Sequence, residues 1–148
     1  MYEPLIQRVS HDVMVIIQNG GERAAVRRAV RMQVIAALGE GEVTAVRVQQ
    51  IAYAAMLGSF QGAEESNLPI EVVGEEASAG VMEGVKEKGG TATSYLQEAI
   101  QGAMAAVEES AAKLKEKASE VAEKSRRALQ SLIERLKGAP QGITGGAR

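Results

Sequence analysis

Residues 94–137 read SYLQEAIQGAMAAVEESAAKLKEKASEVAEKSRRALQSLIERLK, a stretch without proline and with one glycine, Gly102. Ser94 and Gln97 have the spacing of a capping box, in which each side chain accepts a hydrogen bond from the other residue's backbone N–H at the start of a helix. Apolar or small residues recur with a period of about 3.64, close to a straight α-helix and not to the 3.5 of a left-handed coiled coil. The stretch predicts one long amphipathic helix over residues 94–137. At about 65 Å it would exceed the width of a compact domain of this size, so part of it must project, bend back or pack on another chain.

Four shorter helices are expected before it, over residues 4–18, 22–38, 42–65 and 70–88. Each has apolar residues at helical spacing, and the breaks between them contain glycine or proline. The predicted fold is all-α, with an N-terminal helical hairpin or small bundle followed by the long C-terminal helix. We divide the chain into an N-terminal helical region (1–66), an acidic helix (67–90), the long amphipathic helix (91–138) and a glycine-rich tail expected to be flexible (139–148).

The composition suits a single helical domain of 148 residues with a thin core, since only four residues are aromatic. The absence of cysteine excludes disulfides, zinc–thiolate sites and thiol nucleophiles. Charge is uneven: residues 61–109 hold two lysines and ten glutamates, whereas residues 110–148 hold nine bases and four glutamates. These two regions could pair with each other or with other copies of the chain, or they could form solvated helix surfaces.

Small residues recur at equal intervals in the middle of the chain. Three glycines are equally spaced, and each is followed four positions later by another small residue: Gly58 and Gly62, Gly80 and Gly84, Gly102 and Ala106. Each interval is two units of an 11-residue repeat, which returns to nearly the same helix face, and glycine in a helix costs about 1 kcal/mol relative to alanine. We interpret the pattern as a helix-packing interface, within the chain or between chains. An accidental match in a sequence rich in Ala, Gly and Glu is the alternative.

The chain lacks the patterns of an enzyme. His11 is its only histidine, and the adjacent Asp12 is its only aspartate, which on a helix would point about 100° away. This excludes di-iron and multi-histidine metal centres, and no phosphate-binding glycine loop occurs. Carboxylates could pair for acid–base chemistry or bind a divalent cation, but a solvated acidic face explains them: Glu71, Glu75, Glu76, Glu83 and Glu87. We expect no catalytic residue, no metal and no cofactor.

Within the long stretch, residues 111–124 read AAKLKEKASEVAEK. This segment resembles the 11-residue repeats, rich in Ala, Lys and Glu, of late-embryogenesis-abundant stress proteins. It is also similar in texture to the helices of phasins, which coat polyester storage granules. The resemblance covers residues 94–137 at most, rests on composition and includes no diagnostic residue. It implies a helix that binds surfaces or other helices. Residues 1–60 depart from it, because they are too apolar for a chain that stays disordered in water.

Three functions follow as alternatives. The first is a non-enzymatic structural or adaptor protein that self-associates or docks on a protein partner. The second is binding to a lipid or granule surface through an apolar face formed by Leu114, Val121, Leu129, Leu132, Ile133 and Leu136. The third is nucleic-acid binding through three aligned arginines that suit phosphates, Arg23, Arg27 and Arg31.

The nucleic-acid alternative is the least expected, because no aromatic platform for bases accompanies the arginines and pairing with the acidic region explains them equally well. No basic leader precedes an apolar run, and the longest strongly apolar run, residues 13–17, is far too short to span a bilayer. We therefore expect a soluble cytoplasmic protein with a protein partner or a homo-oligomeric state.

Overall fold

The computed structural model describes residues 2–64, 70–89, 93–115, 127 and 130–135. In these residues the fold is all-α, as predicted. Its helices are α1 (Glu3–Gln18), α2 (Arg23–Leu38), α3 (Ala45–Glu64), α4 (Ile70–Gly89) and α5 (Thr93–Lys115). Residues 130–135 are also helical. The ends of α1 to α4 fall within three residues of the predicted ends, because glycine, proline and the apolar period define them locally.

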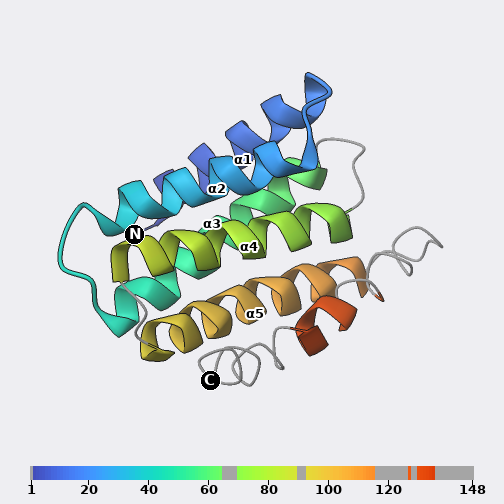
Figure 1. Cartoon of the computed structure of the whole chain (residues 1–148). Coiled ribbons are helices and arrows are strands. Elements are labelled where there is room, and N and C mark those ends of the chain that lie inside the picture. The colour runs from blue at the N-terminus through green and yellow to red at the C-terminus, as the bar shows by residue number, and fades with distance from the viewer. Residues whose placement is uncertain (1, 65–69, 90–92, 116–126, 128–129, 136–148) are drawn as a thin grey trace, which may run out of the picture.

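The helices stack in three layers (Figure 1). α1 and α2 form the first layer, α3 and α4 the second, and α5 the third. The most extensive contacts join α2 to α4, α3 to α5 and α1 to α3, so each later helix packs mainly on the helix two places before it in the chain. α3 contacts the other four helices and is buried on all sides over residues 54–60.

Two local features shape the first two connections between helices. Gly20 follows α1 with a φ of 68°, in the left-handed region that favours glycine, and this reverses the chain into α2. After α2, the Arg47 side chain donates hydrogen bonds to the carbonyl oxygens of Ala37, at 2.8 Å, and Glu42. Arg47 thereby fastens the connection between α2 and α3.

The N-terminal helical hairpin is only part of the arrangement that the structure shows. α1 and α2 follow each other through a short turn, but each makes more contact with a helix of the second layer than with the other. Buried residues of all five helices, together with Leu132 and Ile133, form one hydrophobic cluster. The predicted domain boundaries at 66/67, 90/91 and 138/139 lie outside the described residues.

The prediction of one long helix over residues 94–137 is not matched, since α5 ends at Lys115, and of the alternatives left open for this stretch a continuous straight rod is excluded. The α5 residue Glu109 contacts Tyr53 of α3, while Leu132 lies beside Gly74 and Phe60. A straight helix would carry Leu132 about 34 Å beyond Glu109, whereas Tyr53 and Phe60 are only about 10 Å apart along α3. The physical reason is burial: Leu132 and Ile133 are 3% and 4% exposed, so their apolar surface is removed from water by the chain's own core.

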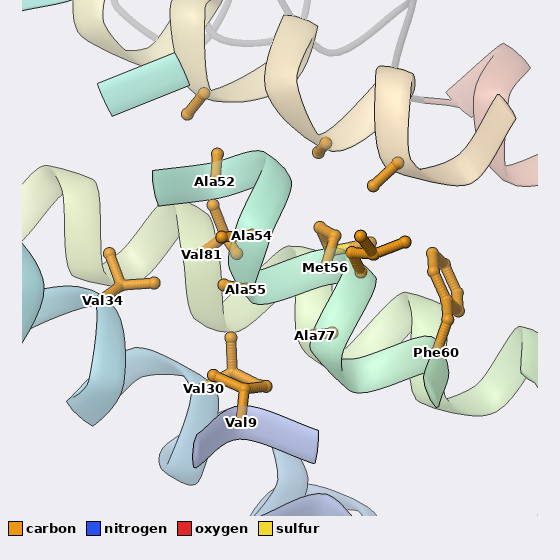
Figure 2. Close-up of a cluster of buried hydrophobic side chains, with 14 of the residues drawn as sticks. Val9, Val30, Val34, Ala52, Ala54, Ala55, Met56, Phe60, Ala77 and Val81 are labelled. Carbon is orange, nitrogen blue, oxygen red and sulfur yellow. The ribbon is translucent and has the colours of Figure 1, made fainter. Parts of the chain in front are cut away.

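Small side chains dominate that core (Figure 2). Valines and alanines from three layers meet around α3, and Phe60 is the one aromatic residue among the fully buried side chains of the described part. Side chains of this size allow the helices to pack closely. Because each small side chain buries little apolar area, a core rich in Ala and Val depends on this close packing for its stability. The close-up includes Val9, Val30, Val34, Ala52, Ala54, Ala55, Met56, Ala77 and Val81.

Candidate functional site

The equally spaced small residues lie at three equivalent helix contacts inside the chain. An ideal Cβ at each first glycine would meet a backbone carbonyl oxygen of the helix two places earlier: Gly58 meets Ile6, Gly80 meets Arg27 and Gly102 meets Gln49. The contacted residue lies 52 or 53 positions earlier in every pair. The same close contact is therefore repeated down the stack of helices.

The second position of each pair is buried as well. A Cβ at Gly62 would lie 2.6 Å from the carbonyl oxygen of Ser10, and one at Gly84 would lie 2.8 Å from Cγ1 of Val34. Ala106 is fully buried. The small-residue faces that suggested association between chains are thus occupied by helices of the same chain.

The aligned arginines of α2 face the acidic helix α4. Arg23 forms ion pairs with Glu75 at 3.0 Å and with Glu76 at 3.3 Å, and Arg27 pairs with Glu83 at 3.6 Å. The third arginine, Arg31, packs its backbone against Gly80 and Gly84, and its buried Nε atom has no hydrogen-bond partner among the described residues. Two of the three candidate phosphate ligands therefore already have anionic partners within the chain.

The apolar face expected to bind a surface is partly inside the core. Leu132 and Ile133 are buried, and the side chains of Leu114, Val121, Leu129 and Leu136 lie outside the described residues. Among the described residues, the exposed large hydrophobic side chains are Met32 and Val46, at 60% and 62% exposure. None of the helices in the described ranges is long and apolar enough to cross a membrane.

A groove of about 490 Å³ opens between α1, α3 and α5. α1 and α5 both pack on α3, and Gly102 brings the backbone of α5 against Gln49 at this point. One helix from each layer therefore contributes to the walls. The lining consists of Tyr2, Glu3, Ile6, Gln49, Gln50, Tyr53, Ala54, Gly102 and Ala105.

Negative charge surrounds Tyr53 in this groove. Its hydroxyl donates a hydrogen bond to Oε2 of Glu109 on α5, at 2.8 Å. The pKa of Tyr53 is raised, first by partial burial, then by the hydrogen bond and charge of Glu109, and also by the charge of Glu3 on α1. Among the described residues, none that lines the groove is a lysine or an arginine. The groove thus combines apolar surface with the carboxylate of Glu3 in its lining, and the carboxylate of Glu109 is joined to it through Tyr53.

A second cavity of about 530 Å³ lies near the connection between α2 and α3 and shares Tyr2 with the groove. Its two arginines already have partners. Arg47 donates to two backbone carbonyls, and Nε of Arg8 donates to Gln33 at 3.3 Å. Arg47 therefore stabilises the connection between α2 and α3, and Arg8 joins α1 to α2. Because both cationic side chains already have these contacts, the groove is the better candidate for binding.

The groove was not predicted from the sequence. Tyr2 and Tyr53 are far apart in the chain, and only the packing of α1 on α3 brings them to one cavity. The available signal was the scarcity of aromatic residues, which makes two of four at one cavity conspicuous. No periodicity or motif connects the two positions, so this signal can be recognised only once the helices are placed.

The described residues offer no assembled polar centre for a metal. No group of three or more histidine, aspartate or glutamate side chains among them could hold an ion. Oδ2 of Asp12 accepts a hydrogen bond from Nε2 of Gln33 at 2.8 Å, while His11 is exposed. Comparison of the chain with protein-family models, curated proteins and solved structures finds no match.

Proposed function

We propose that this chain is a non-enzymatic helical adaptor that docks a protein partner in the groove between α1, α3 and α5. The groove itself is the observation that supports this function. Its volume of about 490 Å³ lies within the roughly 300–1,000 Å³ typical of binding pockets, and its lining joins apolar surface to a few polar groups. Helices from all three layers hold these groups in place, which favours recognition by a preformed site.

The packing of the small residues favours docking of a different molecule over self-association. Gly58, Gly80 and Gly102 are engaged by helices of the same chain. They are consequently not available to a second copy without separating the layers. The groove, in contrast, is open and can receive a side chain or a short segment without disturbing the core.

Burial of the C-terminal apolar residues favours docking over surface binding. An amphipathic helix that lies on a lipid or granule surface inserts its large apolar side chains. Leu132 and Ile133 would have to leave the hydrophobic cluster to do so, and each fully buried aliphatic side chain contributes about 1.5–3 kcal/mol to folding. The ion pairs of Arg23 and Arg27 likewise disfavour phosphate binding by α2.

Filling the groove tests the proposed function. Ala105 lines the groove and is exposed, so Ala105→Trp should occupy the space while leaving the helix intact. Ala36→Trp is the matched control, because Ala36 is an exposed alanine on α2 outside the groove. Circular dichroism would check that both variants fold.

The measurement is quantitative mass spectrometry of proteins captured by the wild type and by the two variants. A partner that binds the wild type and Ala36→Trp but is lost with Ala105→Trp supports docking in the groove. Identical sets of captured proteins for all three chains would contradict it, because no interaction would then depend on the groove.

A further inference from the structure

We infer that the groove between α1, α3 and α5 receives the alkylammonium side chain of a lysine from the partner protein. This inference rests on the proposed function and adds the chemistry that the groove selects. Three observations support it: two tyrosines at one cavity, the carboxylate of Glu3 in its lining with that of Glu109 bonded to Tyr53, and no cationic side chain among the described residues of the lining.

The tyrosines suit a cation with a hydrocarbon stem. The face of an aromatic ring attracts cations, and tyrosine is among the side chains that line known ammonium sites. Tyr2 and Tyr53 both line the groove and are half-buried, and Ile6 adds aliphatic surface beside them. A lysine stem of four carbons can bury its methylene groups against such surface while its charged end stays near polar groups.

The carboxylates supply the opposite charge. Glu3 belongs to the lining itself, and Glu109 accepts the hydrogen bond of the Tyr53 hydroxyl. A cation that enters the groove therefore meets the carboxylate of Glu3 and lies near that of Glu109, whereas an anion would be repelled by both. Attraction of this kind also selects against partners that present glutamate or aspartate at the same position.

The contact of Tyr53 with Glu109 favours lysine over arginine. Arginine recognises a carboxylate best when both oxygens accept its two parallel N–H groups. Oε2 of Glu109 already accepts the Tyr53 hydroxyl, so a bidentate ligand would have to share this oxygen, while Oε1 stays open to a single contact. An ammonium group acts as a point charge and needs only that one oxygen.

The first experiment uses four small probes with the purified protein: hexylammonium, hexylguanidinium, hexanol and hexanoate. Binding is followed by NMR through the backbone amide signals of Gln49, Gln50 and Ala105, which line the groove. We expect hexylammonium to bind about tenfold more tightly than hexanol, in the range expected for a cation beside aromatic rings and carboxylates. Hexylguanidinium should bind more weakly than hexylammonium, and hexanoate should bind least.

Charge-neutral variants separate attraction from a structural role. In the double variant Glu3→Gln/Glu109→Gln, the preference for hexylammonium over hexanol should disappear while hexanol binds as it does to the wild type. Glu87→Gln is the control, because Glu87 is an exposed carboxylate of α4 outside the groove. Equal binding of hexylammonium and hexanol to the wild type, or a preference that survives in the double variant, would overturn the inference.

A second experiment identifies the source of the ammonium group. Proteins in the lysate are acetylated on lysine, which removes the charge, before they are captured by the wild type and by Ala105→Trp. Loss of the groove-dependent partner on acetylation supports a lysine ligand. A groove-dependent partner that still binds after acetylation overturns the lysine ligand and leaves the proposed docking function standing. Ammonium binding without any groove-dependent protein overturns the assignment to a protein lysine, and the docking function with it.

Discussion

Nη1 of Arg135 lies 2.8 Å from Oε1 of Glu75, and the other oxygen of the same carboxylate accepts a hydrogen bond from Nη2 of Arg23 at 3.0 Å. Glu75 on α4 therefore joins α2 in the first layer to the helical residues 130–135. The hydrogen bond from Arg135 is the main reason that the pKa of Glu75 is lowered. Partial burial opposes this effect, and the charge of Arg135 together with the hydrogen bond and charge of Arg23 lowers the pKa further.

This carboxylate should make stability depend on pH in the acid range. Because the folded-state pKa of Glu75 is lowered, its contribution is present above the ordinary unfolded value of about 4.3 and is lost as the pH falls through the folded-state value. The three side chains are 38–55% exposed, so we expect Glu75→Gln to lower the free energy of unfolding at neutral pH by at most about 1 kcal/mol.

The measurement for Glu75→Gln is urea unfolding at a series of pH values. The difference in the free energy of unfolding between the wild type and the variant should disappear as the pH falls. Glu87→Gln, an exposed glutamate of the same helix, is the control and should leave the curve near that of the wild type. A gap of constant size at all pH values would show that the two arginines do not stabilise the charged form of Glu75.

Two glycines of α4 should differ in how much a change to alanine lowers the free energy of unfolding. A Cβ at Gly80 would press on the backbone carbonyl oxygen of Arg27, which cannot move unless α2 shifts. A Cβ at Gly74 would lie 2.8 Å from Cδ2 of Leu132, the end of a flexible side chain, and 3.2 Å from Cε1 of Phe60, which needs to move by only a few tenths of an ångström. Both changes gain about 1 kcal/mol of helix propensity.

Chemical denaturation of Gly80→Ala and Gly74→Ala therefore provides a matched comparison. We expect a net destabilisation of about 1–3 kcal/mol for Gly80→Ala, because overpacking against backbone exceeds the propensity gain. Gly74→Ala should remain within about 1 kcal/mol of the wild type, since the propensity gain offsets a small shift of Leu132. Stabilisation by Gly80→Ala would contradict the close contact of α4 with α2 and would make the equal spacing of the glycines an accident of composition.

The sequence alone predicts the helices and the small-residue positions, because both depend on local properties. Gly58, Gly80 and Gly102 mark where helices approach closely, yet the spacing does not state which helix approaches. The position of Leu132 was not predictable, since the apolar period continues smoothly from α5 into residues 130–135. Burial against Phe60 and Gly74 is a tertiary effect that overrides the pattern of a straight helix.

Tyr53 should titrate at higher pH than an ordinary tyrosine. Its folded-state pKa is raised, so the protonated hydroxyl stabilises the fold below the unfolded value of about 10, and this contribution is lost as the pH rises through the folded-state value. Ultraviolet absorbance of tyrosinate measures the titration. Tyr53→Phe should remove the part of the absorbance change that occurs at the highest pH. Glu109→Gln should lower the pKa of Tyr53 toward the ordinary value of a tyrosine. An unchanged titration in Glu109→Gln would place the cause in burial and the charge of Glu3.

The purified protein is expected to be a monomer at low and at high salt. Its small-residue faces are occupied internally, and Arg23 and Arg27 pair with glutamates of the same chain. Light scattering after size-exclusion chromatography at two salt concentrations measures the mass directly. A stable dimer at both concentrations would contradict docking of a separate partner as the main role, and a dimer that dissociates in high salt would identify paired charges between copies.

The contact between Gly74 and Leu132 predicts non-additive stability. Leu132→Ala removes a side chain that is 3% exposed and should cost about 2–3 kcal/mol, near the low end for a buried leucine. In the double variant, the methyl group of Gly74→Ala enters the space that Cδ2 of Leu132 has left, so the overlap with Leu132 is removed and part of the cavity is filled, while the 3.2 Å approach to Cε1 of Phe60 stays the same. The double variant should therefore be more stable than the sum of the two single changes predicts, by about 0.5–1 kcal/mol. Ser131→Ala, at an exposed neighbour, is the control and should be additive with Gly74→Ala. Additivity of Leu132→Ala with Gly74→Ala in urea unfolding would mean that residues 130–135 do not pack on α4 in solution.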